Sequence, residues 1–200
     1  MKRRMTIPDL GGARAALLHR PHPTVDALGR QLEAIGLGVT KHWPELGPEA
    51  LAADYTFFDA DMGVDGQFPW SPGSAPMPMI ALIGSEAPGR IEWALSHGAD
   101  AQMLKPVGDG GAYGALLIAR HAFEARRGLA DAISGLRRRL DERQTVVRAV
   151  ILLAARGLGE EEAYADLRRR AMAAQETIEA AARRVVAQSG GKNDDRRRAP

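Results

Sequence analysis

The sequence predicts an α/β doubly wound domain, followed by a long coiled-coil helix and a small helical domain. In the first half of the 200-residue chain, short apolar runs alternate with amphipathic segments, which is typical of a parallel sheet covered by helices. A helical pattern without proline follows, and a second helix start with an acidic first turn lies near the C-terminus. A hydrophobic content of 45% is enough for cores in two modules.

Five apolar runs predict the strands of the sheet. Four of these runs are typical of buried strands. The fifth run is less apolar and predicts a strand less clearly. The buried runs are 13–19, 55–58, 79–83 and 101–104, and the weaker run is 38–41.

Two helices are expected between these strands. Thr24 is expected to cap a helix that ends at Gly36, since glycine is the usual residue just past a helix end. Pro88 opens a second helix, which stops at Gly98. Segment 60–78 is rich in glycine and proline and predicts a long loop.

Two motifs follow predicted strands and resemble those of response-regulator receiver domains. Residues 54–62 read DYTFFDADM and residues 98–106 read GADAQMLKP. The resemblance implies a five-stranded flavodoxin-like fold with its site at the carboxyl edge of the sheet. It places Asp59 at the phosphoacceptor position, Lys105 at the site lysine, and Pro106 at the proline that often follows a cis bond.

Other parts of the receiver pattern are missing. His19-Arg20 replaces the expected acidic pair, and Ile83 stands where a Ser or Thr is expected. Phosphoryl transfer to a carboxylate needs Mg²⁺ held by oxygen ligands, so this loss predicts a pseudo-receiver with an inactive Asp59 and Lys105. Arg20 is expected to pair with Asp59 in place of the metal. A working phosphorylation site remains the alternative.

An apolar seam in the long helix predicts a coiled coil. The seam residues recur at the a and d spacing of a heptad. They are Leu129, Ile133, Leu136, Leu140 and Val147, continued by Val150, with Arg143 in one apolar slot. The expected consequence is a homodimer, and the alternative is a long helix packed within one monomer.

The segment 157–172, GLGEEEAYADLRRRAM, begins with three glutamates where a helix N-terminus favours anions. Together with 148–153 and 177–186 it resembles the ANTAR family of AmiR- and NasR-type transcription antiterminators, over roughly the last quarter of the chain. The most specific part is the order E-E-A-Y-x-x-L-R-x-x-A-M at 161–172. The resemblance implies a three-helix domain that binds RNA.

The chain departs from the family pattern at three positions. Val150 stands where the family usually has Lys, Ala154 where it has Met, and Gly159 where it has Ser at the helix start. The missing Lys removes one cation from an RNA-binding surface, so affinity or target choice is expected to differ.

The charges are distributed unevenly. Residues 1–119 carry 9 Lys and Arg against 13 Asp and Glu, and residues 120–200 carry 18 against 12, which gives −4 and +6. A basic second part indicates a polyanionic partner. Arginine forks bind phosphate and an aromatic ring can stack on an unpaired base, although Tyr164 can equally occupy a core position. The predicted RNA-binding residues are Arg148, Arg156, Tyr164, Arg168, Arg169 and Arg170.

The sequence predicts no enzyme, no metal site and no cofactor. The chain has no cysteine, and its five histidines lack the spacing of known metal motifs. A nucleophile elbow, a phosphate-binding glycine loop and a dinucleotide fingerprint are all missing, so no catalytic residue is assigned. Since no run resembles a signal peptide or a membrane span, we expect a cytoplasmic protein without a membrane partner.

The expected organisation has five parts. They are a flexible N-terminus at 1–12, a pseudo-receiver at 13–119, a coiled-coil linker helix at 120–142, an ANTAR domain at 143–188 and a flexible tail at 189–200. The resemblance implies that the protein binds hairpins in nascent leader mRNA and prevents a terminator from forming, under the control of a sequestering ligand-sensing protein. The alternatives are a phosphorylation-controlled ANTAR regulator and a protein-interaction or dimerisation module that does not bind RNA.

Overall fold

The computed structural model describes residues 9–197, with side chains through residue 189. The chain divides into two compact units, Met1–Gly128 and Leu129–Pro200. The termini expected to be flexible, 1–12 and 189–200, lie partly outside the described residues, and their flexibility stays a prediction. Among the helices of the described part, none is both long and apolar enough to cross a membrane.

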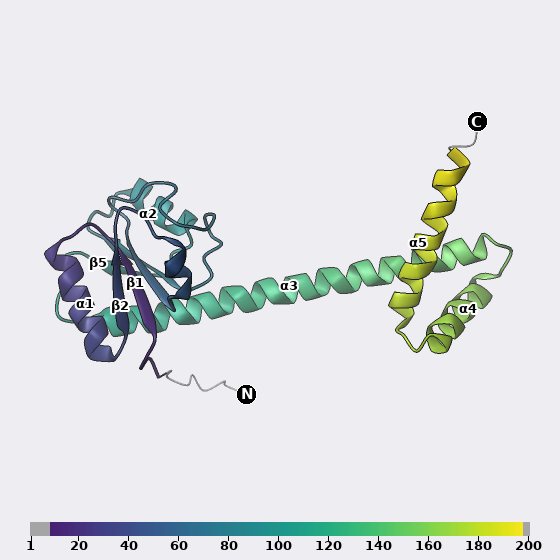
Figure 1. Ribbon diagram of the computed structural model, residues 1–200, viewed down its shortest axis with the longest axis horizontal. Helices are drawn as coiled ribbons and strands as arrows, with labels where there is room; N and C mark the ends of the chain where they lie inside the picture. Colours follow the sequence, from purple (N-terminus) through teal and green to yellow (C-terminus); the bar gives the residue numbers. More distant parts are fainter. Residues whose placement is uncertain (1–8, 198–200) are drawn as a thin grey trace. The chain divides into compact units, whose positions relative to one another are not determined.

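The first unit contains a parallel sheet with helices around it (Figure 1). The sheet has five strands in the order β2-β1-β3-β4-β5. The strands are β1 (Arg14–Leu18), β2 (Gly38–His42), β3 (Tyr55–Asp59), β4 (Met79–Ile83) and β5 (Ala101–Leu104). This order is that of the flavodoxin-like doubly wound fold, which confirms the predicted fold class. Every residue of β3 and β4 is buried, because layers cover both faces of the sheet.

Helices cover the two faces of the sheet. The helices that contribute are α1 (Pro23–Ile35), the 3₁₀ helix η1 (Pro48–Ala52), α2 (Pro88–Ser96) and the beginning of α3 (Ala112–Ala154). On one face α1 and α3 pack in a core that includes Leu28, Phe57 and Leu116. On the other face η1 and α2 pack in a core that includes Phe58 and Ala94.

The N-cap of helix α1 lies two residues before the predicted one. Its N-cap is His22, whose Nδ1 accepts a hydrogen bond from the backbone N–H of Thr24 at 3.2 Å, and Pro23 occupies the first turn. Thr24 lies within the helix and is buried, so the prediction that it caps the helix is wrong. Proline suits the first helical position because the N–H that it lacks would have no partner there. The helix ends at Gly36 as predicted, with a φ of 98°.

Segment 60–78 contains neither helix nor strand, as predicted. Its aromatic side chains nevertheless complete the core on the α2 face. Phe68 packs edge to face against Phe58, with ring centroids 5.5 Å apart. Gly63 lies against Trp93 so closely that a Cβ at this position would come within 2.1 Å of the indole. The loop therefore does part of the covering that a crossover helix would provide in this fold.

The second unit contains the end of α3, α4 (Glu160–Ala173) and α5 (Ile178–Arg197). Its core combines Leu153, Leu167 and Val185 with several alanines, whose small side chains let helices approach closely. Helix α4 starts where the sequence predicts, after Gly159, whose backbone N–H donates to the Glu162 carboxylate at 3.2 Å. Glu162 thus satisfies a backbone donor at the start of the helix, although Gly159 has no side chain that could itself accept a hydrogen bond.

Candidate functional site

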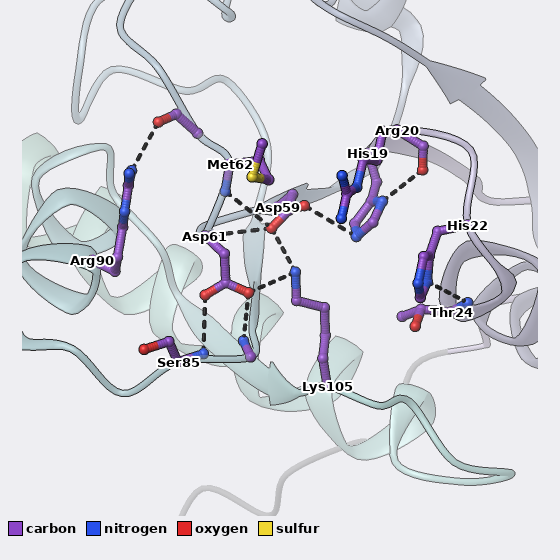
Figure 2. A network of polar contacts seen from close by, with 12 residues as sticks. His19, Arg20, His22, Thr24, Asp59, Asp61, Met62, Ser85, Arg90 and Lys105 are labelled. Atoms are coloured by element: carbon purple, nitrogen blue, oxygen red, sulfur yellow. Dashed lines mark hydrogen bonds and ion pairs between the residues drawn. The ribbon is translucent and has the colours of Figure 1, made fainter.

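The first candidate site lies at the carboxyl edge of the sheet, where ligands of doubly wound folds bind (Figure 2). His19 directly follows β1, Asp59 ends β3 and Lys105 directly follows β5. Because these three strands are parallel, their carboxyl ends bring the three side chains together. Lys105 precedes Pro106 through a cis peptide bond, as the receiver resemblance implies.

Asp59 is the centre of this site, and its side chain is 2% exposed. Its Oδ1 accepts from the Lys105 ammonium at 2.7 Å and from the Asp61 backbone N–H at 3.0 Å. Its Oδ2 lies 3.1 Å from Nε2 of His19, which is equally buried. The structure therefore brings the predicted pair of Asp59 and Lys105 into direct contact.

The expected pairing of Arg20 with Asp59 is wrong, because His19 takes that place. Just after the end of β1, His19 is buried and points into the site, whereas Arg20 is exposed. The backbone carbonyl of Arg20 still takes part, since it accepts a hydrogen bond from Nδ1 of His19 at 2.7 Å.

Asp61 belongs to this site as well, although the sequence did not single it out. Its carboxylate accepts from Lys105 at 2.7 Å, from the N–H of Gly84 at 2.8 Å and from the N–H of Ser85 at 3.0 Å. Burial raises the pKa of the Asp61 carboxyl, but the hydrogen bonds from Lys105, Ser85 and Gly84 outweigh burial and hold the pKa below its ordinary value. A Cβ at position 84 would come within 2.7 Å of the carboxylate, so a side chain there would disturb the contact.

The second candidate site is the basic surface of α4. Arg168 is exposed and forms no ion pair with another residue of the described side chains, 9–189. Arg169 and Arg170 share Asp166 at 3.3 and 2.6 Å. These contacts, led by the hydrogen bond from Arg170, lower the pKa of Asp166. Two of the three adjacent cations are thus partly neutralised by a carboxylate on their own helix.

The remaining predicted RNA-binding residues are Arg148, Arg156 and Tyr164. Arg148 and Arg156 are exposed on or just after α3, and Arg156 donates to the Ser189 hydroxyl at 3.3 Å. Tyr164 is 48% exposed and is therefore not a core residue. It lines a groove of about 720 Å³ between α3 and α4. The other lining residues are Val146, Val147, Val150, Ile151, Ala154, Glu160 and Glu161.

The apolar seam lies on the surface of the single chain. Its residues are between 41% and 63% exposed, which is unusual for five large apolar side chains at heptad spacing on one helix. They are Leu129, Ile133, Leu136, Leu140 and Val147.

The chain thus joins a flavodoxin-like α/β unit to a helical unit that follows it in the sequence. Residues 134–186, which lie within the second unit, match the family model described as ANTAR domain. This match begins within the segment that the sequence analysis assigned to a linker helix, 120–142. No curated protein matches the chain.

Several solved structures resemble the chain at low identity. The Rec1 domain of ShkA in complex with c-di-GMP is 22% identical over 56% of this chain and 95% of that chain, with a TM-score of 0.44. A signal receiver domain of a modulated diguanylate cyclase from Desulfovibrio desulfuricans G20 is 16% identical over 57% and 98%, with a TM-score of 0.45. Full-length FixJ from B. japonicum is 16% identical over 90% and 98%, with a TM-score of 0.44.

Proposed function

We propose that the protein is a transcription antitermination regulator of the AmiR/NasR type, which binds hairpins in nascent leader mRNA and prevents a terminator hairpin from forming. The observation that carries the proposal is the ANTAR domain at 134–186, within which Arg168 stands exposed beside further cations. Exposed arginines on a helix are suited to the phosphates of a folded transcript.

The geometry of α4 supports a contact surface for RNA. Tyr164 and Arg168 are four residues apart, so they are neighbours on one face of the helix. Both are exposed, and together they offer a ring for stacking on an unpaired base and a fork for its phosphate. Val150 is half-buried in the groove and supplies no cation where the family usually has Lys, so the arginines of α4 carry more of the binding.

A homodimer through the apolar seam is part of the same proposal. Pairing the exposed seam with a second copy would bury five large apolar side chains per chain. Two ANTAR domains on one dimer would hold two hairpins, and the second contact would gain from the high effective concentration set by the first.

The controlling input is proposed to be a ligand-sensing protein that sequesters the regulator until an inducer releases it. The support is the receiver-like site, in which a histidine replaces the acidic pair needed for phosphorylation. We place this regulator in the cytoplasm, where leader mRNA is made, and assign it no enzymatic activity.

The experiment is a gel shift with the leader RNA of the protein's own operon, at several salt concentrations. Arg168→Ala is expected to weaken binding and to reduce the slope of log K against log salt by about 0.7–0.9, the contribution of one phosphate contact. Arg30→Ala removes an exposed arginine from α1 of the first unit and serves as the matched control.

Each rival function predicts a different result. If the wild-type protein is a dimer but binds no leader hairpin in the gel shift, it is a protein-interaction module instead. Labelling of Asp59 by acetyl phosphate, together with loss of regulation in Asp59→Asn, would identify a phosphorylation-controlled regulator. A monomer in sedimentation analysis would contradict the proposed dimer.

A further inference from the structure

The receiver fold implies a Mg²⁺ ion beside the phosphoacceptor carboxylate, and the residues around Asp59 do not fit one. Magnesium requires oxygen ligands in nearly octahedral geometry, from one or two carboxylates and several waters. Here Oδ1 of Asp59 accepts from Lys105 and from a backbone N–H. Both oxygens of Asp61 also accept from nitrogen donors. Three of the four carboxylate oxygens therefore already face hydrogen-bond donors.

The fourth oxygen, Oδ2 of Asp59, faces the ring of His19 at 3.1 Å. Both atoms are buried, and neither forms a hydrogen bond with any other described residue. The other ring nitrogen, Nδ1, lies 2.7 Å from the carbonyl of Arg20, which can only accept. Nδ1 therefore carries a proton. A bare lone pair on Nε2 would then repel the carboxylate that it faces (Figure 2), and a second ring proton removes this repulsion.

We propose that His19 decides which cation this site holds: its imidazolium, with the ammonium of Lys105, stands in for the divalent ion and excludes it. Two carboxylates, Asp59 and Asp61, then face two cations, and the cluster is neutral without a metal. Isolated buried carboxylates would be strongly disfavoured, so this balance accounts for the burial of Asp59. The inference concerns the receiver-like unit and does not depend on RNA binding.

The test is to convert the site into one that binds a divalent cation. His19→Asp replaces the cation with a carboxylate directed at Asp59, which supplies the ligand set that Mg²⁺ prefers. The variant is expected to bind one Mn²⁺ per chain, in competition with Mg²⁺, as measured from the electron paramagnetic resonance signal of free Mn²⁺. The wild-type protein is expected to leave that signal unchanged.

His22→Asp is the matched control. The ring of His22 lies 6.0 Å from that of His19 but is exposed and caps α1, and aspartate is an equally good cap. This variant adds the same charge to the same loop and is expected to acquire no Mn²⁺ site. Circular dichroism confirms that each variant is folded.

Two results would overturn the proposal. One is Mn²⁺ binding by the wild-type protein that disappears in Asp59→Asn, and the other is a folded His19→Asp variant that binds no Mn²⁺. If His19→Asp fails to fold, nitrogen NMR of the wild-type protein decides. Both ring nitrogens of His19 are expected at protonated shifts, and a neutral ring would refute the assignment.

Discussion

Truncation of Leu167 to alanine tests whether the second unit depends on its own small core. Leu167 on α4 is 0% exposed, and in the second unit it and Leu153 are the large side chains buried most completely among the described residues. A leucine-to-alanine change at such a site costs about 3 kcal/mol, from lost burial and from the cavity left behind. A small helical domain has a total stability of about 5 kcal/mol, so more than half would be lost.

Hydrogen exchange read by mass spectrometry measures this loss separately in each unit. A cost of about 3 kcal/mol lowers the protection of α4 amides about a hundredfold. Protection in β3 is expected to stay the same, because β3 belongs to cores that share no residue with that of the second unit. Met172→Ala on the same helix is the control, since Met172 is 70% exposed and its loss should change protection about twofold at most.

The reasoning would be refuted in either of two ways. One is a less than tenfold loss of α4 protection in Leu167→Ala, which would mean that other contacts stabilise the unit. The other is an equal loss in β3, which would mean that the two units unfold together.

Two further predictions concern the first unit. Gly63→Ala should destabilise this unit by about 1–3 kcal/mol in thermal unfolding, because the new Cβ would collide with the Trp93 ring. The control is Gly114→Ala on α3, where a Cβ meets nothing within 4 Å and the change should be neutral or stabilising. Equal effects of the two substitutions would contradict the packing of the loop against Trp93. The pKa of Asp61 is lower in the folded protein than in the unfolded chain, where it is about 3.9. Its contacts, including that with Lys105, therefore stabilise the folded protein at pH values above the unfolded-state pKa. This stabilisation is lost as the pH falls through the folded-state pKa. Asp61→Asn should therefore lower the unfolding temperature at pH 7 and approach the wild type below about pH 4, and a difference that persists in acid would be evidence against this account.

The sequence predicted the strands well because their residues are apolar without interruption. The run at 79–83 became β4 with the same bounds, and 55–58 became all but the last residue of β3. The long helix and the start of α4 were equally predictable, since helical spacing and the acidic first turn are local features. The pair of Asp59 and Lys105 was expected from the resemblance of 54–62 and 98–106 to receiver-domain motifs.

Sequence reasoning failed where the answer depended on the direction of a side chain. It chose Arg20 as the partner of Asp59 from its charge, whereas the structure directs His19 into the site. Asp61 was missed because its donors, the N–H groups of Gly84 and Ser85, follow another strand. An acidic residue two positions after Asp59 was the one signal that could have indicated its role.

The sequence by itself determined the order of strands and helices along the chain, the basic second part and the resemblance of the last quarter to the ANTAR family, since all of these depend on local composition and spacing. Only the tertiary structure decided which charges meet at the carboxyl edge, where Lys105 contacts an aspartate 46 residues earlier in the chain. It also decided that the loop at 60–78 completes a core and that Tyr164 is half exposed. The physical reason is that hydrogen bonds and burial depend on distances of a few ångströms between distant segments, which no local pattern specifies.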